Sequence, residues 1–272
     1  IGGQVLLTTH SPQIVEQFAS DALVMMGGEG KPTCSGSELC REVEALGYRL
    51  NPIVAEVFFS RGVFLVEGPS ETVFFRALAT AVGIDLDREN LSILSVDGVG
   101  FKPYVLCCEA LGIPWTLRTD NDVFKVPKKE RRRLAGVARA YGIAESLGRA
   151  GVEALWLKVK DSLEWDGGPD VPKEVFAAVD ELRAALESEG IYLSDRDLEY
   201  DLIASSLGTV LEEHYGVEDQ EELYAAMTKR KAEGMHAFIA RHSNDLGCLA
   251  ESAFCQPLKR LWSSTSAGCD DD

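Results

Sequence analysis

The chain has 272 residues, of which 46% are hydrophobic, and a formal net charge of −17 at pH 7. This length allows one large domain or two modest ones, and the acidic balance argues against a general nucleic-acid coat protein. No run of about 18 apolar residues suggests a membrane span, and seven cysteines without a CxxC pair favour a reducing cytoplasm over a disulfide framework.

The first 60 residues read like the interior of a longer protein, with no signal-peptide pattern. Residues 4–9 (QVLLTT) predict a short buried strand, and a helix follows from Pro12. Residues 21–26 predict a second strand, residues 27–37 a Gly- and Ser-rich loop or linker, and residues 38–58 a helical segment.

A regular alternation begins at residue 61. Apolar strands are predicted in GVFLVEG, LSILSVDG and PWTLRTDND, and helices in SETVFFRALATAVG and KPYVLCCEALG. Continuous apolar strands that alternate with helices of this length are typical of βαβ units. We therefore predict an α/β fold with a parallel sheet flanked by helices.

Beyond residue 124 the pattern changes. Residues 128–190 predict mostly helix, with a break at WDGGPDVP, and GIYLSD predicts a further strand. Residues 197–263 are again helical in pattern, and the polar end of the chain is expected to be disordered. The fold class thus includes an additional, mostly helical domain or insertion.

Acidic residues follow four of the predicted strands. Ligands of an open parallel sheet gather at the carboxyl ends of its strands, and the acids at these ends are Glu67, Glu71, Asp97, Asp120, Asp122, Asp195, Asp197, Glu199 and Asp201. Converging carboxylates repel one another unless a cation lies among them. Oxygen-only ligation suits Mg²⁺, Mn²⁺ or Ca²⁺, and two such ions can clamp a scissile phosphate.

Any one of these acids is more commonly a helix cap or a turn residue. Asp97 precedes a glycine, which favours a turn. Glu67 combined with Asp120 and Asp122 is a more specific pattern, and for these three we favour a functional role.

The quoted motifs resemble a known family. A Glu after the first strand and a DxD after the third are similar to the Toprim fold, and LVEGPSE, DGVGF, RTDND and DLEYDL resemble the Toprim half of the overcoming-lysogenization-defect (OLD) family of ATP-dependent nucleases. The upstream QVLLTTHSPQIVE is similar to the last strand and His switch of an ABC-type ATPase. No GxxxxGK[ST] phosphate loop is present, so His10 can only be the end of an ATP site, and we expect no ATPase activity from this chain alone.

The resemblance implies a domain division. Residues 1–60 would be the end of an ATPase domain and a linker, 61–127 the first part of the Toprim domain, 128–189 a helical insertion, 190–205 its last strand with metal ligands, 206–263 a C-terminal helical part, and 264–272 a disordered tail. The implied partners are DNA, the ATPase domain of the same full-length chain, and a second copy held through that ATPase half.

The resemblance also implies a two-metal nuclease site. Its metal ligands would be Glu67, Glu71, Asp120, Asp122, Glu199 and Asp201, with Glu71 as a ligand or general base. Two Mg²⁺ or Mn²⁺ ions would act in catalysis, and Ca²⁺ would bind without supporting it. Lys229 or Lys231 would stabilise transition-state charge, with Lys259 a weaker candidate.

A basic run, KVPKKERRR, follows the DxD directly, and six of its nine residues are basic. Charge runs are usually solvated surface, but this position favours contact with DNA phosphates by Lys125, Lys128, Lys129, Arg131 and Arg132. No base-reading motif accompanies them, so we expect weak sequence preference.

Three alternatives to a DNA nuclease remain open at this point. The first is another Toprim phosphotransferase, such as a primase or topoisomerase. The second is a haloacid-dehalogenase-type phosphatase, which carries its DxD after the first strand instead of the third. The last is a non-catalytic DNA-binding or regulatory module of an ATPase.

Overall fold

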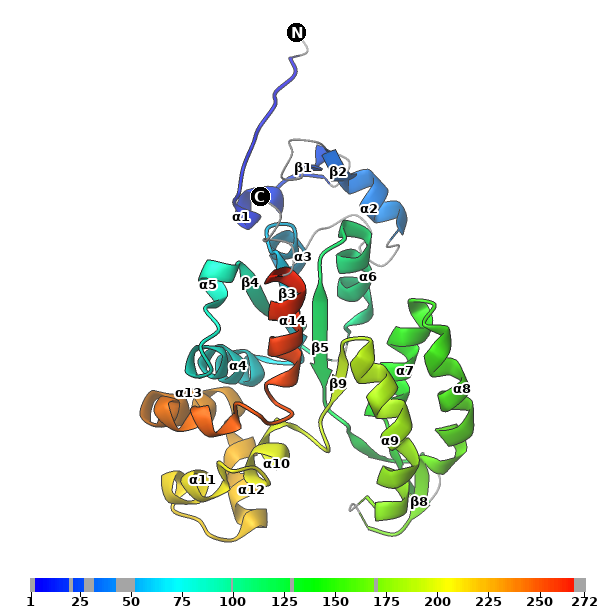
Figure 1. Ribbon diagram of the computed structural model, residues 1–272, viewed down its shortest axis with the longest axis vertical. Helices are drawn as coiled ribbons and strands as arrows, with labels where there is room; N and C mark the ends of the chain where they lie inside the picture. Colours follow the sequence, from blue (N-terminus) through cyan, green and yellow to red (C-terminus); the bar gives the residue numbers. More distant parts are fainter. Residues whose placement is uncertain are drawn as a thin grey trace.

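The centre of the molecule is a four-stranded parallel sheet (Figure 1). It is seen in a computed structural model that describes residues 3–19, 22–26, 32–42, 52–98, 100–127, 130–168 and 171–266. The strands, in spatial order, are β4 (Leu91–Ser95), β3 (Gly62–Val66), β5 (Trp115–Thr119) and β9 (Ile191–Leu193). All neighbouring pairs are parallel, which confirms the predicted α/β class.

The central strand β3 is buried along its whole length because helices cover both faces of the sheet. Val63 and Leu65 enter one hydrophobic cluster, while Phe64 and Val66 enter the other, as the two-residue period of a strand requires. The helices over the first face include α6 (Lys102–Leu111), α7 (Gly136–Ser146) and α9 (Lys173–Ser188), and those over the second include α4 (Pro69–Ala81), α13 (Lys231–His242) and α14 (Gln256–Ser266).

An insertion separates β5 from β9. It contains α7, α8 (Ala150–Val159), the 3₁₀ turn η3 (Lys160–Ser162) and α9, as the prediction of a helical segment required. It also contains a small antiparallel sheet that the sequence reading missed, in the order β6 (Val123–Lys125), β7 (Arg131–Leu134) and β8 (Glu164–Asp166). The two ends of the basic run therefore lie on the strands β6 and β7 and not on a helix.

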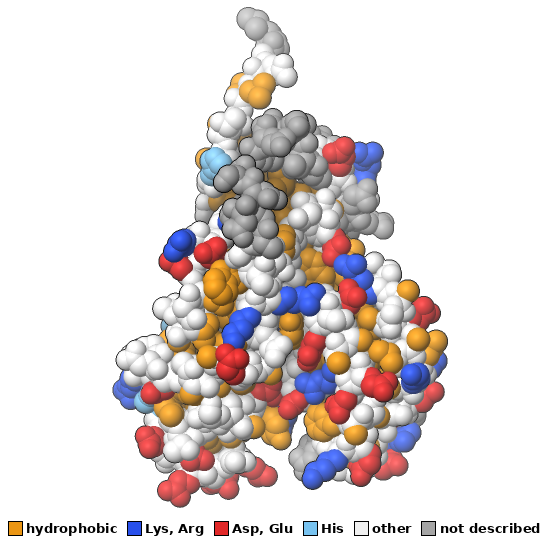
Figure 2. All heavy atoms as spheres, viewed as in Figure 1, with side chains coloured by type: hydrophobic (Ala, Val, Ile, Leu, Met, Phe, Trp, Pro, Cys, Tyr) orange, Lys and Arg blue, Asp and Glu red, His pale blue; other side chains and the backbone are white. Residues whose placement is uncertain are grey.

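The remaining C-terminal residues form a second helical lobe. Its elements are α10 (Leu198–Ile203), α11 (Gly208–Tyr215), α12 (Gln220–Lys229), α13 and η4 (Ser243–Leu249). A short α5 (Leu86–Glu89) precedes β4. The carboxyl ends of the sheet strands point toward the insertion and this C-terminal helical lobe (Figure 1). The space-filling view shows a notch between the two (Figure 2).

The N-terminal part contains α1 (Pro12–Val15), β1 (Val24–Met26), β2 (Pro32–Ser35), α2 (Gly36–Glu42) and α3 (Pro52–Val57). The strand predicted at residues 4–9 is wrong for this structure: these residues are extended, and the side chains of Val5 and Leu6 are 89% and 87% exposed. No described strand pairs with them, so their backbone does not form the hydrogen-bond ladder of a β-sheet. Among the described residues, no helix is both long and apolar enough to cross a membrane.

Candidate active site

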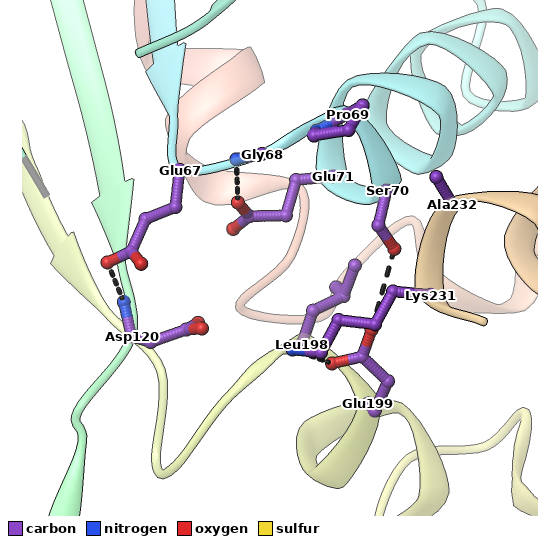
Figure 3. Close-up of a pocket in the computed structure, with 10 residues that line it drawn as sticks. All are labelled: Glu67, Gly68, Pro69, Ser70, Glu71, Asp120, Leu198, Glu199, Lys231 and Ala232. Atoms are coloured by element: carbon purple, nitrogen blue, oxygen red, sulfur yellow. Dashed lines mark hydrogen bonds and ion pairs between the residues drawn. The ribbon is translucent and has the colours of Figure 1, made fainter. Parts of the chain in front are cut away.

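Four carboxylates from three segments of the chain line one pocket of about 170 Å³ at the carboxyl edge of the sheet (Figure 3). Glu67 directly follows β3, Asp120 follows β5, Glu71 lies in the first turn of α4, and Glu199 lies in the first turn of α10. Lys231, at the start of α13, completes the polar lining. The structure thus gathers four of the six predicted metal ligands and one of the two predicted lysines.

Glu67 is fixed by three donors on a single oxygen. Its Oε1 accepts hydrogen bonds from the Thr119 hydroxyl at 2.5 Å, the Asp120 N–H at 2.9 Å and the Arg139 guanidinium at 2.8 Å. Its backbone carbonyl accepts the N–H of Gly98. The strand-to-helix turn is therefore tied to both neighbouring strands, and this sets the direction of the Glu67 side chain.

Glu71 closes the first turn of α4. Its Oε2 accepts the Gly68 N–H at 2.9 Å, a capping arrangement that suits a negative charge at a helix N-terminus. Its Oε1 is buried and has no hydrogen-bond partner in the described part of the chain. Burial, opposed by Arg118 and reinforced by the charge of Glu67, raises the pKa of Glu71 to about 7.

Asp120 experiences the same crowding. Its Oδ1 accepts a hydrogen bond from the Ser194 hydroxyl at 3.2 Å. Burial, followed by the charges of Glu71 and Glu67, raises the pKa of Asp120 to about 8. In the cation-free chain, nearby positive charge does not compensate the ionised forms of Glu71 and Asp120.

Glu199 and Lys231 form the opposite wall. The Glu199 side chain is only 3% exposed, and Lys231 Nζ lies 3.1 Å from its Oε2. Burial favours the neutral amine, but Glu199, Asp197 and Asp120 outweigh it and raise the pKa of Lys231. Lys229, the last residue of α12, is exposed and does not line the pocket, so the geometry favours Lys231.

Asp122 does not line this pocket. It pairs instead with Arg139 Nη2 at 2.6 Å, and Arg139 also reaches Glu67. Arg139 was missed from the sequence, because it lies on the insertion helix α7, in GVARAYG, far from any acidic motif.

The DND turn itself positions α7. Asn121 is fully buried, and its side-chain oxygen accepts the Val137 N–H at 3.3 Å. A Cβ on Gly136 would lie 2.3 Å from the Asp120 carbonyl oxygen, so only glycine permits this close approach. The start of α7 therefore rests on the acidic turn, with Arg139 about one helical turn beyond Gly136.

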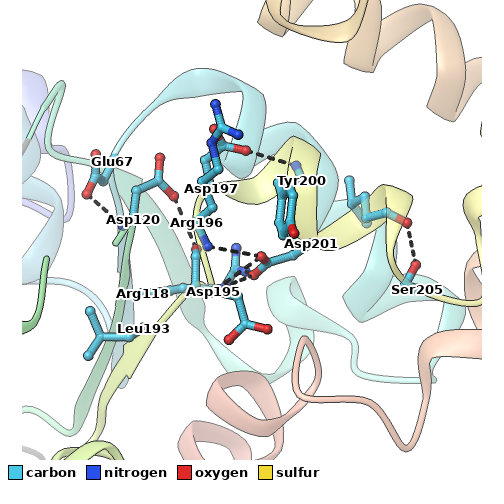
Figure 4. Close-up of polar contacts among 12 residues, drawn as sticks. Glu67, Arg118, Asp120, Leu193, Asp195, Arg196, Asp197, Tyr200, Asp201 and Ser205 are labelled. Carbon is cyan, nitrogen blue, oxygen red and sulfur yellow. Dashed lines mark hydrogen bonds and ion pairs between the residues drawn. The ribbon is translucent and has the colours of Figure 1, made fainter. Parts of the chain in front are cut away.

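Asp201 is not brought to the pocket, in contrast to its predicted role. It accepts Arg118 Nη2 at 2.5 Å and the N–H groups of Asp195 and Arg196 (Figure 4). Glu199 and Asp201 are two residues apart on a helix, so they point in different directions. Burial, opposed by Arg118, raises the pKa of Asp201 to about 6.

Two other acids at this edge have structural contacts. Asp197 caps α10 by accepting the Tyr200 N–H at 2.8 Å and also accepts the Tyr224 hydroxyl. Asp97 is an exposed turn residue at φ +52° that accepts the Ser95 hydroxyl.

Of the predicted DNA contacts, Lys128 and Lys129 lie outside the described residues. Lys125 is paired with Glu130 at 2.9 Å, and Arg131 with Glu164 and Asp166. Arg132 stands on β7 with no ion pair among the described residues. Lys259, the weaker lysine candidate, pairs with an exposed glutamate away from the pocket.

Comparison with known proteins agrees with the motifs. Residues 58–122 match the family model of the overcoming lysogenization defect protein-like TOPRIM domain. The chain is 29% identical over 221 residues to Endonuclease GajA of Bacillus cereus, covering 78% of this chain and 37% of that protein. It is 26% identical over 137 residues to the OLD nuclease of Thermus scotoductus, covering 46% of this chain and 26% of that protein.

Solved structures of two OLD C-terminal regions are also similar. The Xanthomonas campestris pv. campestris region is 24% identical, covers 78% of this chain and 97% of its own, and has a TM-score of 0.45. The Burkholderia pseudomallei region is 22% identical, covers 76% and 99%, and has a TM-score of 0.46. By the family match, residues 58–122 correspond to an OLD-like Toprim domain, and the chain is similar to two curated nucleases.

Proposed function

We propose that this chain is the catalytic region of a metal-dependent DNA nuclease that hydrolyses phosphodiester bonds by a two-metal mechanism. The observation that carries the proposal is the convergence of four carboxylates from three segments of the chain on one pocket that also contains Lys231: Glu67, Glu71, Asp120 and Glu199. The two curated relatives are named as an endonuclease and a nuclease. Both are longer than this chain, which spans 37% of one and 26% of the other.

The pocket suits hard divalent cations. Its donors are carboxylate oxygens, which Mg²⁺ and Mn²⁺ prefer. One of them, Glu71 Oε1, is buried and finds no hydrogen-bond partner among the residues that the structure describes, and the raised pKa values of Glu71 and Asp120 indicate unneutralised charge. In the described part of the chain, no group of three or more potential ligands is already arranged as a metal centre, so the side chains must adjust when ions bind.

The proposed ligands are Glu67, Glu71, Asp120 and Glu199, with Asp122 joining if Arg139 releases it. Ca²⁺ would occupy the same oxygens without supporting catalysis. Bound ions would supply charge neutralisation for the phosphate and a lower pKa for the attacking water.

The remaining steps fall to side chains of this chain. In hydrolysis a water oxygen attacks phosphorus, the bond to one sugar oxygen breaks, and the water proton passes through a base to the leaving oxygen. Glu71, whose Oε1 has no hydrogen-bond partner among the described residues, is suited to hold that proton when it acts as the base in place of a metal ligand. Lys231 carries a positive charge toward the pocket and is suited to stabilise the extra negative charge of the transition state.

We further propose that the β6–β7 hairpin contacts DNA phosphates through Lys125, Arg131 and Arg132, because this hairpin leaves the sheet directly after Asp122. In the full-length protein we infer an ATPase domain upstream, ending near His10, with dimerisation through that half and a cytoplasmic location. A non-catalytic DNA-binding module is the alternative.

Conversion of supercoiled plasmid to nicked or linear forms tests the proposal. The wild-type chain should cleave with Mg²⁺ or Mn²⁺ and not with EDTA, and Asp120→Asn should abolish cleavage. Asp180→Asn, on the exposed face of α9, is the matched control and should retain the wild-type rate. Cleavage that survives Asp120→Asn would favour the non-catalytic alternative.

A further inference from the structure

Arg139 takes the place of a cation between two predicted metal ligands. Its Nη1 lies 2.8 Å from Glu67 Oε1 and its Nη2 lies 2.6 Å from Asp122 Oδ2. The side chains of Arg139 and Glu67 are 15% and 16% exposed and that of Asp122 is 36% exposed, so solvent screens the Asp122 end of this bridge more than the Glu67 end. The bridge joins a residue at the end of β3 to one after β5 and therefore spans the edge on which the carboxylates gather.

We propose that Arg139 is a built-in counter-ion of the metal site, which a divalent cation must displace from Asp122 in order to recruit that carboxylate. This inference rests on the proposed function. Asp122 cannot give the same oxygen to the guanidinium and to a metal ion, and a guanidinium beside a divalent cation is repelled by it. Arg139 therefore lowers the affinity of the chain for the metal.

Placement of the arginine supports a specific function in preference to general charge balance. Asn121 caps α7, and Gly136 allows α7 to touch the Asp120 backbone, so the helix delivers Arg139 to this edge. The second neighbouring cation, Arg118, is buried and pairs with Asp201 on the other side of β5. Lys231 pairs with Glu199, so each of these cations has its own acidic partner at this edge.

The test measures Mn²⁺ binding by the whole chain. Binding is measured by titration calorimetry and by the loss of the electron paramagnetic resonance signal of free Mn²⁺. Arg139→Gln should bind Mn²⁺ at least tenfold more tightly than the wild type. Arg149→Gln is the matched control, because Arg149 likewise bridges two acids, Glu109 at 2.9 Å and Glu189 at 3.0 Å, away from the pocket. It should bind Mn²⁺ with wild-type affinity.

Unchanged or weaker binding by a folded Arg139→Gln would overturn the inference, and weaker binding would indicate instead that Arg139 orients Glu67 for the metal. Circular dichroism checks the fold. If Arg139→Gln does not fold, Arg139→Met is used, since it keeps an unbranched side chain and removes the charge. Tighter Mn²⁺ binding supports displacement, and equal or weaker binding refutes it. Plasmid cleavage by the wild type separates the failure of this inference from the failure of the proposed function. If the wild type cleaves DNA and the variant binds Mn²⁺ with unaltered affinity, only the counter-ion role is refuted. If neither protein binds Mn²⁺, the counter-ion role and the metal site are refuted together.

Discussion

The crowded carboxylates predict that the cation-free chain loses stability as the pH rises. Folding raises the pKa of Glu71 from 4.5 to about 7 and that of Asp120 from 3.8 to about 8. Because the pKa values are raised in the folded chain, the contribution of the two carboxyl groups to the free energy of unfolding is complete below about pH 4. It is lost progressively as the pH rises, until the pH passes about 8. A tenfold change in a proton-binding constant is about 1.4 kcal/mol, so the raised pKa of Glu71 alone accounts for roughly 3 kcal/mol.

The contributions of Glu71 and Asp120 cannot be added, because the charge of Glu71 is itself one of the causes that raise the pKa of Asp120. A loss of roughly 3 kcal/mol corresponds to a fall in the melting temperature of about 6–10 °C for a chain of this size. Thermal unfolding in EDTA between pH 5 and pH 8.5 measures it. Saturating Mn²⁺ should reverse the loss at high pH, because the cation binds the charged carboxylates.

The net charge of −17 also destabilises the chain at high pH, so the double variant Glu71→Gln/Asp120→Asn is the necessary comparison. It should keep the shallow, general pH dependence and lose the steep part. If the double variant and the wild type melt with the same dependence on pH in EDTA, the reasoning from carboxylate crowding is refuted.

Three more substitutions test separate parts of the structure. Lys231→Ala should lower the cleavage rate by roughly 10²-fold without weakening Mn²⁺ binding, because a lysine that stabilises the transition state is not a ligand; Lys229→Ala should stay close to the wild-type rate, and the reverse order would contradict the assignment. Arg118→Leu should lower the free energy of unfolding by about 3–5 kcal/mol, since it leaves the largely buried Asp201 carboxylate without its positively charged partner, and denaturant unfolding should show partial recovery when Asp201→Leu is added. Arg132→Ala should lower the slope of log affinity for DNA against log salt by about 0.9, if this side chain contacts one phosphate; an unchanged slope would exclude that contact.

Much of the sheet and its acidic edge could be predicted, because buried parallel strands are written as continuous apolar runs and their ends are marked by polar residues. Glu67 and Asp120 were predicted from their position at those ends, and the structure brings both to one pocket. The pocket also depends on Glu199, which follows β9, a strand of only three residues. That Glu199 lies in the first turn of α10 and faces the pocket could be seen only in the structure.

Other features depend on contacts that no local pattern encodes. Arg139 meets Glu67 across 72 residues of sequence, and nothing in GVARAYG marks it. Lys229 and Lys231 are equivalent in sequence, but the chain breaks at Arg230 (φ −143°, ψ 60°) between two helices, and only Lys231 then faces the pocket. The three-residue strands of the insertion are too short for an alternation to be recognised.

The DND turn has a consequence for how this protein can vary. Its middle residue, Asn121, faces inward and holds the start of α7, while its neighbours carry the acids. Tolerance to insertions and deletions should therefore begin only beyond the first turn of α7. The distal loops of that inserted lobe, around Gly148 and Gly167, are where relatives can differ in length while the chemistry at the sheet's edge stays in register.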